Sequence, residues 1–239
     1  PAYLTAKDYA APLRKGIDLN RATSAASLGS ITGPHREGDN TTHFSVIDAD
    51  GNAVANTYTL NFNYGLGLVA EGTGILLNNE LDDFTAAPGA ANAFGLVGFE
   101  ANLPGPGKRP LSSMSPTIVL KDGKPVLITG TPGGSRIISA VTQVIVNAID
   151  YRMNIAAAVA APRIHHQWLP DDARAERGIP AEVLTELRDK GHKVVDTLGQ
   201  TSANSIAVGP HGPLGAPDPR TGDAAPRFVP GAIAATWLA

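Results

Sequence analysis

Two stretches of alternating sequence decide the fold: TTHFSVID at residues 41–48 and AVANTYTL at residues 53–60. The side chains alternate with a period of two, which is typical of half-buried β-strands, and Phe44 and Val46 fall on one face of the first stretch. An Asp-Gly pair at 50–51 separates the two stretches and supplies a hairpin turn. The sequence therefore predicts an antiparallel hairpin that begins at Thr41.

Further elements follow the same rules outside this hairpin. A second hairpin is predicted from TIVL at 117–120 and PVLIT at 125–129, around another Asp-Gly turn. Apolar spacing and Gly or Pro stops predict helices, and short β-branched runs predict late strands. The helices are expected at 6–15, 135–152, 155–161 and 180–191, and the late strands at 194–195 and 205–208. Hairpins combined with helices favour an α+β layered fold over a doubly wound parallel sheet.

Composition excludes several classes of function. The chain has 239 residues, with 19 basic and 22 acidic side chains and a formal net charge of −3, which argues against a general nucleic-acid binder. It has no cysteine, so disulfides, thiolate metal sites and a cysteine nucleophile are excluded. No run of about 18 apolar residues predicts a transmembrane helix.

Two motifs that suggest cofactors do not hold up. GLGLVA at 65–70 matches a dinucleotide fingerprint, but Gly72 and Gly74 follow at once and prevent the helix that the fingerprint requires. His165 and His166 are adjacent and lack a nearby third ligand, so a zinc site is disfavoured. We therefore expect neither an organic cofactor nor a metal.

The chemistry centres on the bond between Asn40 and Thr41. A glycine- and charge-rich segment at 33–40 has no apolar periodicity and reads as a mobile loop. If the bond is cut, Thr41 gains an α-amine with a pKa of about 8, which can accept the proton of its own hydroxyl. The cut can be autocatalytic, since the Thr41 hydroxyl can attack the Asn40 carbonyl and water can open the resulting ester. Judged by position alone, ordinary β-propensity is by far the simpler explanation of a threonine at a strand start.

Several motifs, which follow one another along the chain, make the functional prediction for Thr41 more specific. They are TTHFSV (41–46), TYTLN (57–61), GILLNNELDDF (74–84), KRPLSSMSPT (108–117), GTPGGSR (130–136) and APRIHHQW (161–168). In order and spacing, from about Tyr3 to Arg220, the chain resembles the γ-glutamyltranspeptidases. The resemblance implies an αββα sandwich of the N-terminal nucleophile (Ntn) hydrolase type. Residues 1–40 would be the end of a large subunit with its pre-cleavage loop, and residues 41–239 the small subunit.

The same resemblance implies that this sandwich is incomplete without the large-subunit region. The chain would then begin inside a longer precursor, and Thr41 would be the chemically meaningful N-terminus. We expect residues 1–239 alone to be poorly soluble or inactive, because an uncovered sheet face is apolar.

The resemblance also assigns catalytic roles. Thr41 would be the nucleophile and, through its amine, the base, with cleavage between Asn40 and Thr41. Thr59 would orient the Thr41 hydroxyl. The backbone N–H groups of Gly133 and Gly134 would form the oxyanion hole, helped by the following helix N-terminus.

Five further residues would hold the substrate. Asn61, Glu80 and Asp83 would bind the α-ammonium of a γ-glutamyl group, although an acidic turn in solvent is the simpler reading of the two carboxylates. Ser112 and Ser113 would bind its α-carboxylate through their hydroxyls.

Two segments depart from the family pattern. Residues 88–110 form a long Gly/Pro-rich loop that is either a solvated surface loop or an active-site lid, and it carries Phe94 where lid-bearing relatives often have Tyr. Phe94 keeps a ring that can gate the site but lacks a hydroxyl to bond Asn61. Residues 221–239 form an atypical tail that the family pattern does not place.

The function implied is a γ-glutamyl transferase/hydrolase. It would cleave the γ-glutamyl amide of glutathione through a Thr41 acyl-enzyme and pass the acyl group to water, an amino acid or a peptide. One alternative is a glutaryl- or cephalosporin-type acylase of the same fold, and another is a non-catalytic, uncleaved relative. The family further implies a periplasmic, secreted or extracellular location.

Overall fold

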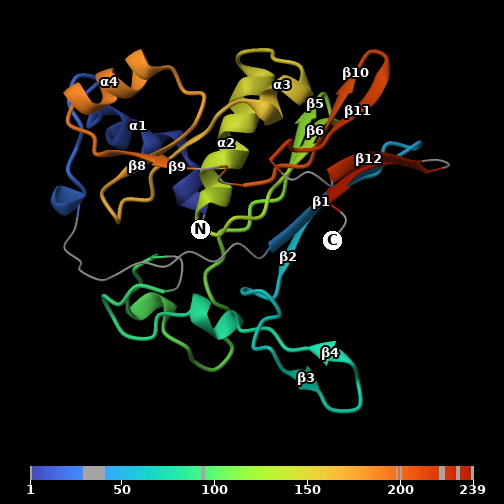
Figure 1. Ribbon diagram of the computed structural model, residues 1–239, viewed down its shortest axis with the longest axis horizontal. Coiled ribbons are helices and arrows are strands. Elements are labelled where there is room, and N and C mark those ends of the chain that lie inside the picture. The colour runs from blue at the N-terminus through green and yellow to red at the C-terminus, as the bar shows by residue number, and fades with distance from the viewer. Residues whose placement is uncertain are drawn as a thin grey trace.

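The computed structural model describes residues 2–28, 41–92, 95–197, 199, 201–220, 224–229 and 232–237 (Figure 1). Its centre is a pair of antiparallel four-stranded sheets. The first sheet has the order β12 (Ala224–Val229), β13 (Ala232–Trp237), β1 (Thr41–Asp48), β2 (Ala53–Thr59). The second has the order β11 (Gly212–Ala216), β10 (Ser205–Gly209), β6 (Lys124–Thr129), β5 (Thr117–Lys121).

The two sheets pack face to face around a small apolar core. Ile47 of β1 meets Ile128 of β6 and Ile206 of β10, and all three are buried. Helices α2 (Arg136–Ile149) and α3 (Ile155–Ala160) cover the other face of the second sheet. Val144 of α2 and Val159 of α3 pack there with Leu127. Burial of such side chains contributes roughly 1.5–3 kcal/mol each, so this layer anchors the fold.

The outer face of the first sheet is open in the described part of the chain. Val54 and Tyr58 of β2 point away from the second sheet, and both are about half exposed. The described residues thus form three layers, α-β-β. The α+β class and the Ntn-type sheet pair predicted from sequence are confirmed.

A third unit lies beside the sandwich. Strands β7 (Ile164–His165), β8 (Ala173–Glu176) and β9 (Val194–Thr197) form a small mixed sheet, in which α4 (Ala181–Asp189) connects the parallel pair β8 and β9. Residues 2–28 carry η1 (Ala2–Thr5), α1 (Lys7–Lys15) and η2 (Ala25–Leu28). They are tied to this unit where Trp168 Nε1 donates to the Ala25 carbonyl at 2.9 Å.

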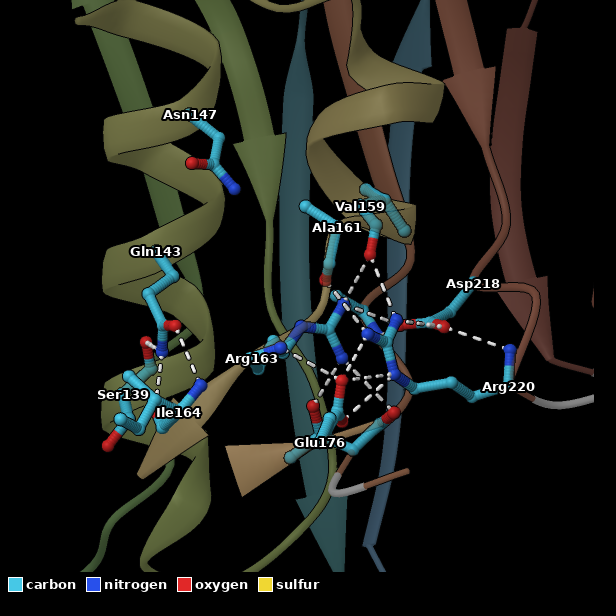
Figure 2. Close-up of polar contacts among 12 residues, drawn as sticks. Ser139, Gln143, Asn147, Val159, Ala161, Arg163, Ile164, Glu176, Asp218 and Arg220 are labelled. Atoms are coloured by element: carbon cyan, nitrogen blue, oxygen red, sulfur yellow. Dashed lines mark hydrogen bonds and ion pairs between the residues drawn. The ribbon is translucent and has the colours of Figure 1, made fainter. Parts of the chain in front are cut away.

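A buried ion cluster joins this unit to the sandwich (Figure 2). Arg163 Nη2 lies 2.7 Å from Asp218 Oδ2, and Arg220 bonds both Asp218 and Glu176. Asp218 Oδ2 also accepts the backbone N–H of Ala203. Because both carboxylates and the Arg163 guanidinium are almost fully buried, their charges are compensated within the cluster.

A short hairpin projects from the opposite end of the molecule. It is formed by β3 (Val69–Ala70) and β4 (Ile75–Leu76), and it belongs to neither large sheet (Figure 1). Gly65 and Gly67 both have positive φ in its approach, and a Cβ on Gly65 would lie 2.1 Å from the Leu77 carbonyl oxygen. These glycines therefore serve a tight turn, as the sequence indicated, and open no helix.

The helices and strands that the sequence predicted begin and end within a few residues of their expected positions. Two other features of the fold differ from what the sequence indicated. The buried face of β1 carries His43, Ser45 and Ile47, while Phe44 and Val46 are only partly buried on the other face. The tail that the family pattern left unplaced forms β12 and β13, and β13 pairs directly with β1.

Candidate active site

The proposed nucleophile occupies the first position of β1. Thr41 is partly buried and lies opposite Thr59 of β2 in the antiparallel register. Thr59 Oγ1 accepts the backbone N–H of Asn61 at 2.8 Å. Asn61 is buried and has a φ of 73°, a conformation that non-glycine residues rarely adopt, so the chain turns sharply as it leaves β2. The turn carries the Asn61 side chain to the end of the sheet where Thr41 lies.

A small pocket opens at this end of the sheet and collects most of the predicted site. Its walls come from well-separated segments and are Thr41, Thr59, Asn61, Asp83, Leu96, Ser112, Ser113, Met114, Gly134 and Ile137. Seven of these ten are residues that the sequence singled out. A larger, more apolar pocket between α1 and the β7–β9 unit contains none of the predicted residues. We therefore take the small pocket as the candidate active site, since it joins the proposed nucleophile to polar binding groups.

The glycine pair lies directly ahead of α2. Gly133 and Gly134 have φ values of 126° and 56°, which only glycine adopts without strain. Their carbonyls accept the N–H groups of Arg136 and Ile137, which start the helix. Within the described part of the chain, the N–H groups of the two glycines have no acceptor. Gly134 lines the pocket and Gly133 does not. Free amides at a helix N-terminus can stabilise a negative charge.

An acid pair forms a second feature of the site. Glu80 and Asp83 lie at the two ends of the short 3-10 helix η3 (Glu80–Asp83), and their side chains share a hydrogen bond. Burial, followed by the charge of Glu80, raises the pKa of Asp83 to about 7. Burial also raises the pKa of Glu80. Two carboxylates this close resist simultaneous ionisation, so a cation in the pocket would be bound strongly.

Only one of the two acids lines the pocket. Asp83 is a wall residue, and Glu80 acts from behind it. The Glu80 Oε1 atom is buried and has no hydrogen-bond partner among the described residues. Asn61 Nδ2 donates to the Asn79 carbonyl at 3.2 Å, which ties the β2 exit to the start of η3. Asn61 and Asp83 thus line the same pocket, and their binding of an α-ammonium together with Glu80 stays a prediction.

The two serines form another part of the pocket wall. Ser112 Oγ accepts the N–H of Met114 at 3.2 Å, which leaves its hydroxyl proton available to a ligand. Ser113 is partly buried, and its carbonyl accepts the hydroxyl of Ser115. Both serine residues line the pocket together with Asp83. Hydroxyl donors and a carboxylate in one pocket suit a zwitterionic α-amino acid group.

Some predicted features lie outside the described residues, and some wall residues were missed. Asn40, the residue before the expected cut, and Phe94, the expected gate, are not among the described residues. Leu96 comes from the 88–110 segment and lines the pocket, but the role of that segment as a lid stays a prediction. Met114 and Ile137 were not predicted as wall residues, although they adjoin the serine and glycine motifs that were.

The fold and this site define a class of protein. Two packed antiparallel sheets, a threonine at the start of an inner strand and a glycine pair before a covering helix are the arrangement of an N-terminal nucleophile hydrolase. The family model described as Gamma-glutamyltranspeptidase matches residues 2–227. The chain belongs to the γ-glutamyltranspeptidase family.

Individual relatives agree with this assignment. The glutathione hydrolase proenzyme of Escherichia coli K12 is 55% identical over 221 residues, which cover 92% of this chain and 38% of that protein. A mutant of Helicobacter pylori γ-glutamyltranspeptidase superposes with a TM-score of 0.72 at 52% identity, over 75% of this chain and 100% of that chain. A cephalosporin acylase from Bacillus halodurans gives a TM-score of 0.74 at 26% identity, over 99% of this chain and 39% of that chain.

The chain spans little more than a third of the length of the curated proenzymes that it matches first. Among the described residues, every helix is too short or too polar to cross a bilayer.

Proposed function

We propose that this chain carries the nucleophile of a γ-glutamyl transferase/hydrolase that acts on glutathione and related γ-glutamyl amides. The observation that carries the proposal is the pocket itself, which joins Thr41 to Asp83, Ser112 and Gly134. A γ-glutamyl group presents an amide at one end and an α-ammonium and α-carboxylate at the other. The pocket offers a complementary group for each of these parts.

The first step of the proposal frees the nucleophile. Thr41 Oγ1 attacks the carbonyl carbon of Asn40, the Asn40–Thr41 amide becomes an ester on Thr41, and water hydrolyses that ester. The products are an Asn40 carboxylate and a Thr41 α-amine. That amine has a pKa of about 8, so near neutral pH a usable fraction is unprotonated and can act as the base.

The second step transfers the acyl group. The α-amine takes the Thr41 hydroxyl proton as Oγ1 attacks the γ-carbonyl carbon. The resulting oxyanion is held by the amides of Gly133 and Gly134, and each such donor is typically worth about 10²–10³ in rate. The leaving amine takes the proton from the α-ammonium of Thr41. Water, an amino acid or a peptide amine then attacks the ester and regenerates Thr41.

Substrate preference follows from the polar groups that would surround the α-carbon of the donor. Asp83, supported by Glu80 and Asn61, would hold the α-ammonium, and Ser112 and Ser113 would hold the α-carboxylate. The name of the Escherichia coli relative, a glutathione hydrolase proenzyme, supports glutathione as the donor. The proposal needs neither a metal nor an organic cofactor, because the nucleophile, the base and the oxyanion donors all come from the chain.

A second candidate is an acylase of the same fold. It is favoured by the Bacillus halodurans cephalosporin acylase structure, which covers almost the whole chain. Glutaryl-type side chains lack an α-ammonium, however, and would leave Asp83 and Glu80 without a counter-charge. The acid pair favours the γ-glutamyl donor, because burial and the neighbouring Glu80 raise the pKa of Asp83 and an α-ammonium would supply the opposite charge.

The proposal includes a partner and a location. The partner is the large-subunit region of the same precursor, and its support is the share of the proenzyme relatives that lies beyond the matched part. A periplasmic, secreted or extracellular location is supported by family membership alone.

The decisive experiment expresses this chain together with the upstream region of its precursor. Mass measurement should show a cut before Thr41 in the wild type and none in Thr41→Ala. Thr41→Ser is the matched control, because it keeps the hydroxyl and should retain cleavage. Hydrolysis of a γ-glutamyl anilide but not of a glutaryl anilide would support the transferase. The reverse preference would identify an acylase, and cleavage in Thr41→Ala would refute the autocatalytic step.

A further inference from the structure

A buried histidine lies between the nucleophile strand and the glycine segment. His43 is 1% exposed and follows Thr41 by two residues, so both side chains project from the same face of β1 toward the second sheet. Burial lowers the pKa of His43 to about 4, so the ring is neutral at physiological pH. The ring does not line the pocket, and the proposed reaction gives it no chemical role.

The hydrogen bonds of His43 fix its tautomer. Ser45 Oγ donates its proton to the Asn204 carbonyl at 2.9 Å, so at its 3.0 Å contact with His43 Nε2 it must accept. Nε2 therefore carries the hydrogen, and Nδ1 accepts the hydroxyl proton of Thr57 at 2.8 Å. Every polar atom of the ring is satisfied, which holds the imidazole in one orientation across β1 and β2.

One face of this ring lies against the segment that supplies the oxyanion amides. A Cβ built on Gly130 would be 2.2 Å from His43 Cε1 and 2.4 Å from Nδ1, so ring and backbone are in direct contact. Gly130 opens the stretch Gly130–Gly134, which ends at the pocket. The imidazole thus fills the space between the strand of the nucleophile and the segment of the amides.

Asn204, which directly precedes β10 of the second sheet, also links β1 to Gly130. Its backbone N–H donates to the Gly130 carbonyl at 3.2 Å, and its Nδ2 donates to the His43 carbonyl at 3.3 Å. β1 pairs with β2 and β13, and β6 pairs with β5 and β10, so no strand pairing fixes β1 relative to the glycine segment. Their spacing is set by the packing of the two sheets, and within that packing His43 and Asn204 contact Gly130 directly.

We propose that His43 is a positioning residue, which sets the distance between the Thr41 hydroxyl and the amides of Gly133 and Gly134. This inference rests on the proposed function and adds to it the residue that holds the nucleophile and the oxyanion hole at the right distance from each other. A displacement of about 1 Å at a reacting group can cost about 10²-fold in rate. Substrate binding uses the acid pair and the serines, which the ring does not contact.

The test uses the full precursor and a γ-glutamyl anilide. His43→Phe keeps a ring of similar size but loses both hydrogen bonds, and it should lower kcat by about 10²-fold while KM changes less than about two-fold. Thr57→Val removes only the hydroxyl that Nδ1 accepts and should lower kcat by about ten-fold. His211→Gln, at an exposed turn, is the matched control and should behave as wild type.

A second readout separates this inference from the proposed function. Hydrogen–deuterium exchange of the 130–136 segment should be faster in His43→Phe than in wild type and unchanged in His211→Gln. An unaltered kcat, or equal changes in kcat and KM with unaltered exchange, would overturn the role of His43. If the wild type is inactive, the proposed function fails, and the exchange comparison still decides whether His43 holds the glycine segment. If His43→Phe does not fold, Thr57→Val gives the same two readouts.

Discussion

At the scale of single residues, Asp83 has the strongest electrostatic signature of the candidate site. Its carboxyl lines the pocket, and burial next to Glu80 raises its pKa to about 7. An α-ammonium binds well only to the ionised form. Protonation of Asp83 therefore competes with substrate binding in the physiological pH range.

We expect KM for a γ-glutamyl donor to rise as the pH falls below about 7, because Asp83 gains its proton there. Asp83→Asn should raise KM by about 10- to 100-fold, the usual cost of losing a charged hydrogen bond, and should remove most of this pH dependence. Steady-state kinetics between pH 6 and 9 provide the measurement. Glu71→Gln, on the exposed turn of the β3–β4 hairpin, is the control. A KM for Asp83→Asn equal to that of wild type would place the ammonium elsewhere.

Asp83 should also lower the free energy of unfolding as the pH rises. Because the folded pKa of Asp83 lies above its ordinary value of 3.8, the folded state binds more protons than the unfolded state between the two values. Stability is therefore lost as the pH rises through about 7. Asp83→Asn should melt higher than wild type at pH 8, and the difference should shrink at pH 5. Thermal melts at the two pH values test this, and a lower melting temperature for the variant at pH 8 would contradict it.

At the scale of elements, the sequence predicted what depends on local pattern. Alternation and the Asp-Gly turns gave the two hairpins, and helical spacing with Gly and Pro stops gave α2, α3 and α4. The buried face of β1 could not be predicted in this way, because it carries His43 and Ser45 and their partners come from β2 and from Asn204. Hydrogen bonds between distant segments make such polar positions stable, and a single strand does not show them.

For the candidate site too, the sequence predicts one part and the tertiary fold determines the rest. The motifs named its residues through the family resemblance, whereas their meeting at one pocket is a property of the tertiary fold. Glu80 and Asp83 are an intermediate case, since they lie three positions apart on one short helix, which brings them together locally. Their burial, and hence the raised pKa of Asp83, depends on the elements packed around them.

The ion cluster between α3, β8 and the end of β11 leads to a stability prediction at this scale. Asp218→Ala would leave Arg163 buried without its carboxylate and should cost about 3–5 kcal/mol in the free energy of unfolding. Urea unfolding measures this loss. Glu186→Gln breaks the exposed pair with Lys190 and should leave the free energy of unfolding almost unchanged. Comparable losses in the two variants would mean that burial of the cluster contributes little.

At the scale of the whole molecule, two of the exposed apolar surfaces of the described chain belong to the sheet of the nucleophile and to the segment that follows it. One is the outer face of the first sheet, at Val54 and Tyr58. The other is the β3–β4 hairpin, where Leu66, Leu68 and Ile75 are each more than half exposed. An isolated two-stranded hairpin is marginally stable in water, so both surfaces suit a covering partner.

We expect co-expression with the upstream precursor region to increase the soluble yield of this chain and to protect the hairpin from limited proteolysis. The readouts are soluble fraction and the rate of cutting within residues 64–81, with cutting near the exposed Arg188 of α4 as the internal reference. Chain 1–239 that is soluble, fully active and equally resistant by itself would contradict the expectation.

The pairing of β13 with β1 has a consequence for the timing of synthesis. The strand that begins with Thr41 is made early, but one of its two neighbours, Ala232–Trp237, is the last described strand of the chain. While a ribosome is still adding those residues, β1 has one bare edge and its sheet is unfinished. The nucleophile strand is therefore enclosed on both edges only after Ala232–Trp237 has been made, so a cleavage at Thr41 that needs the complete sheet would come after synthesis of that strand.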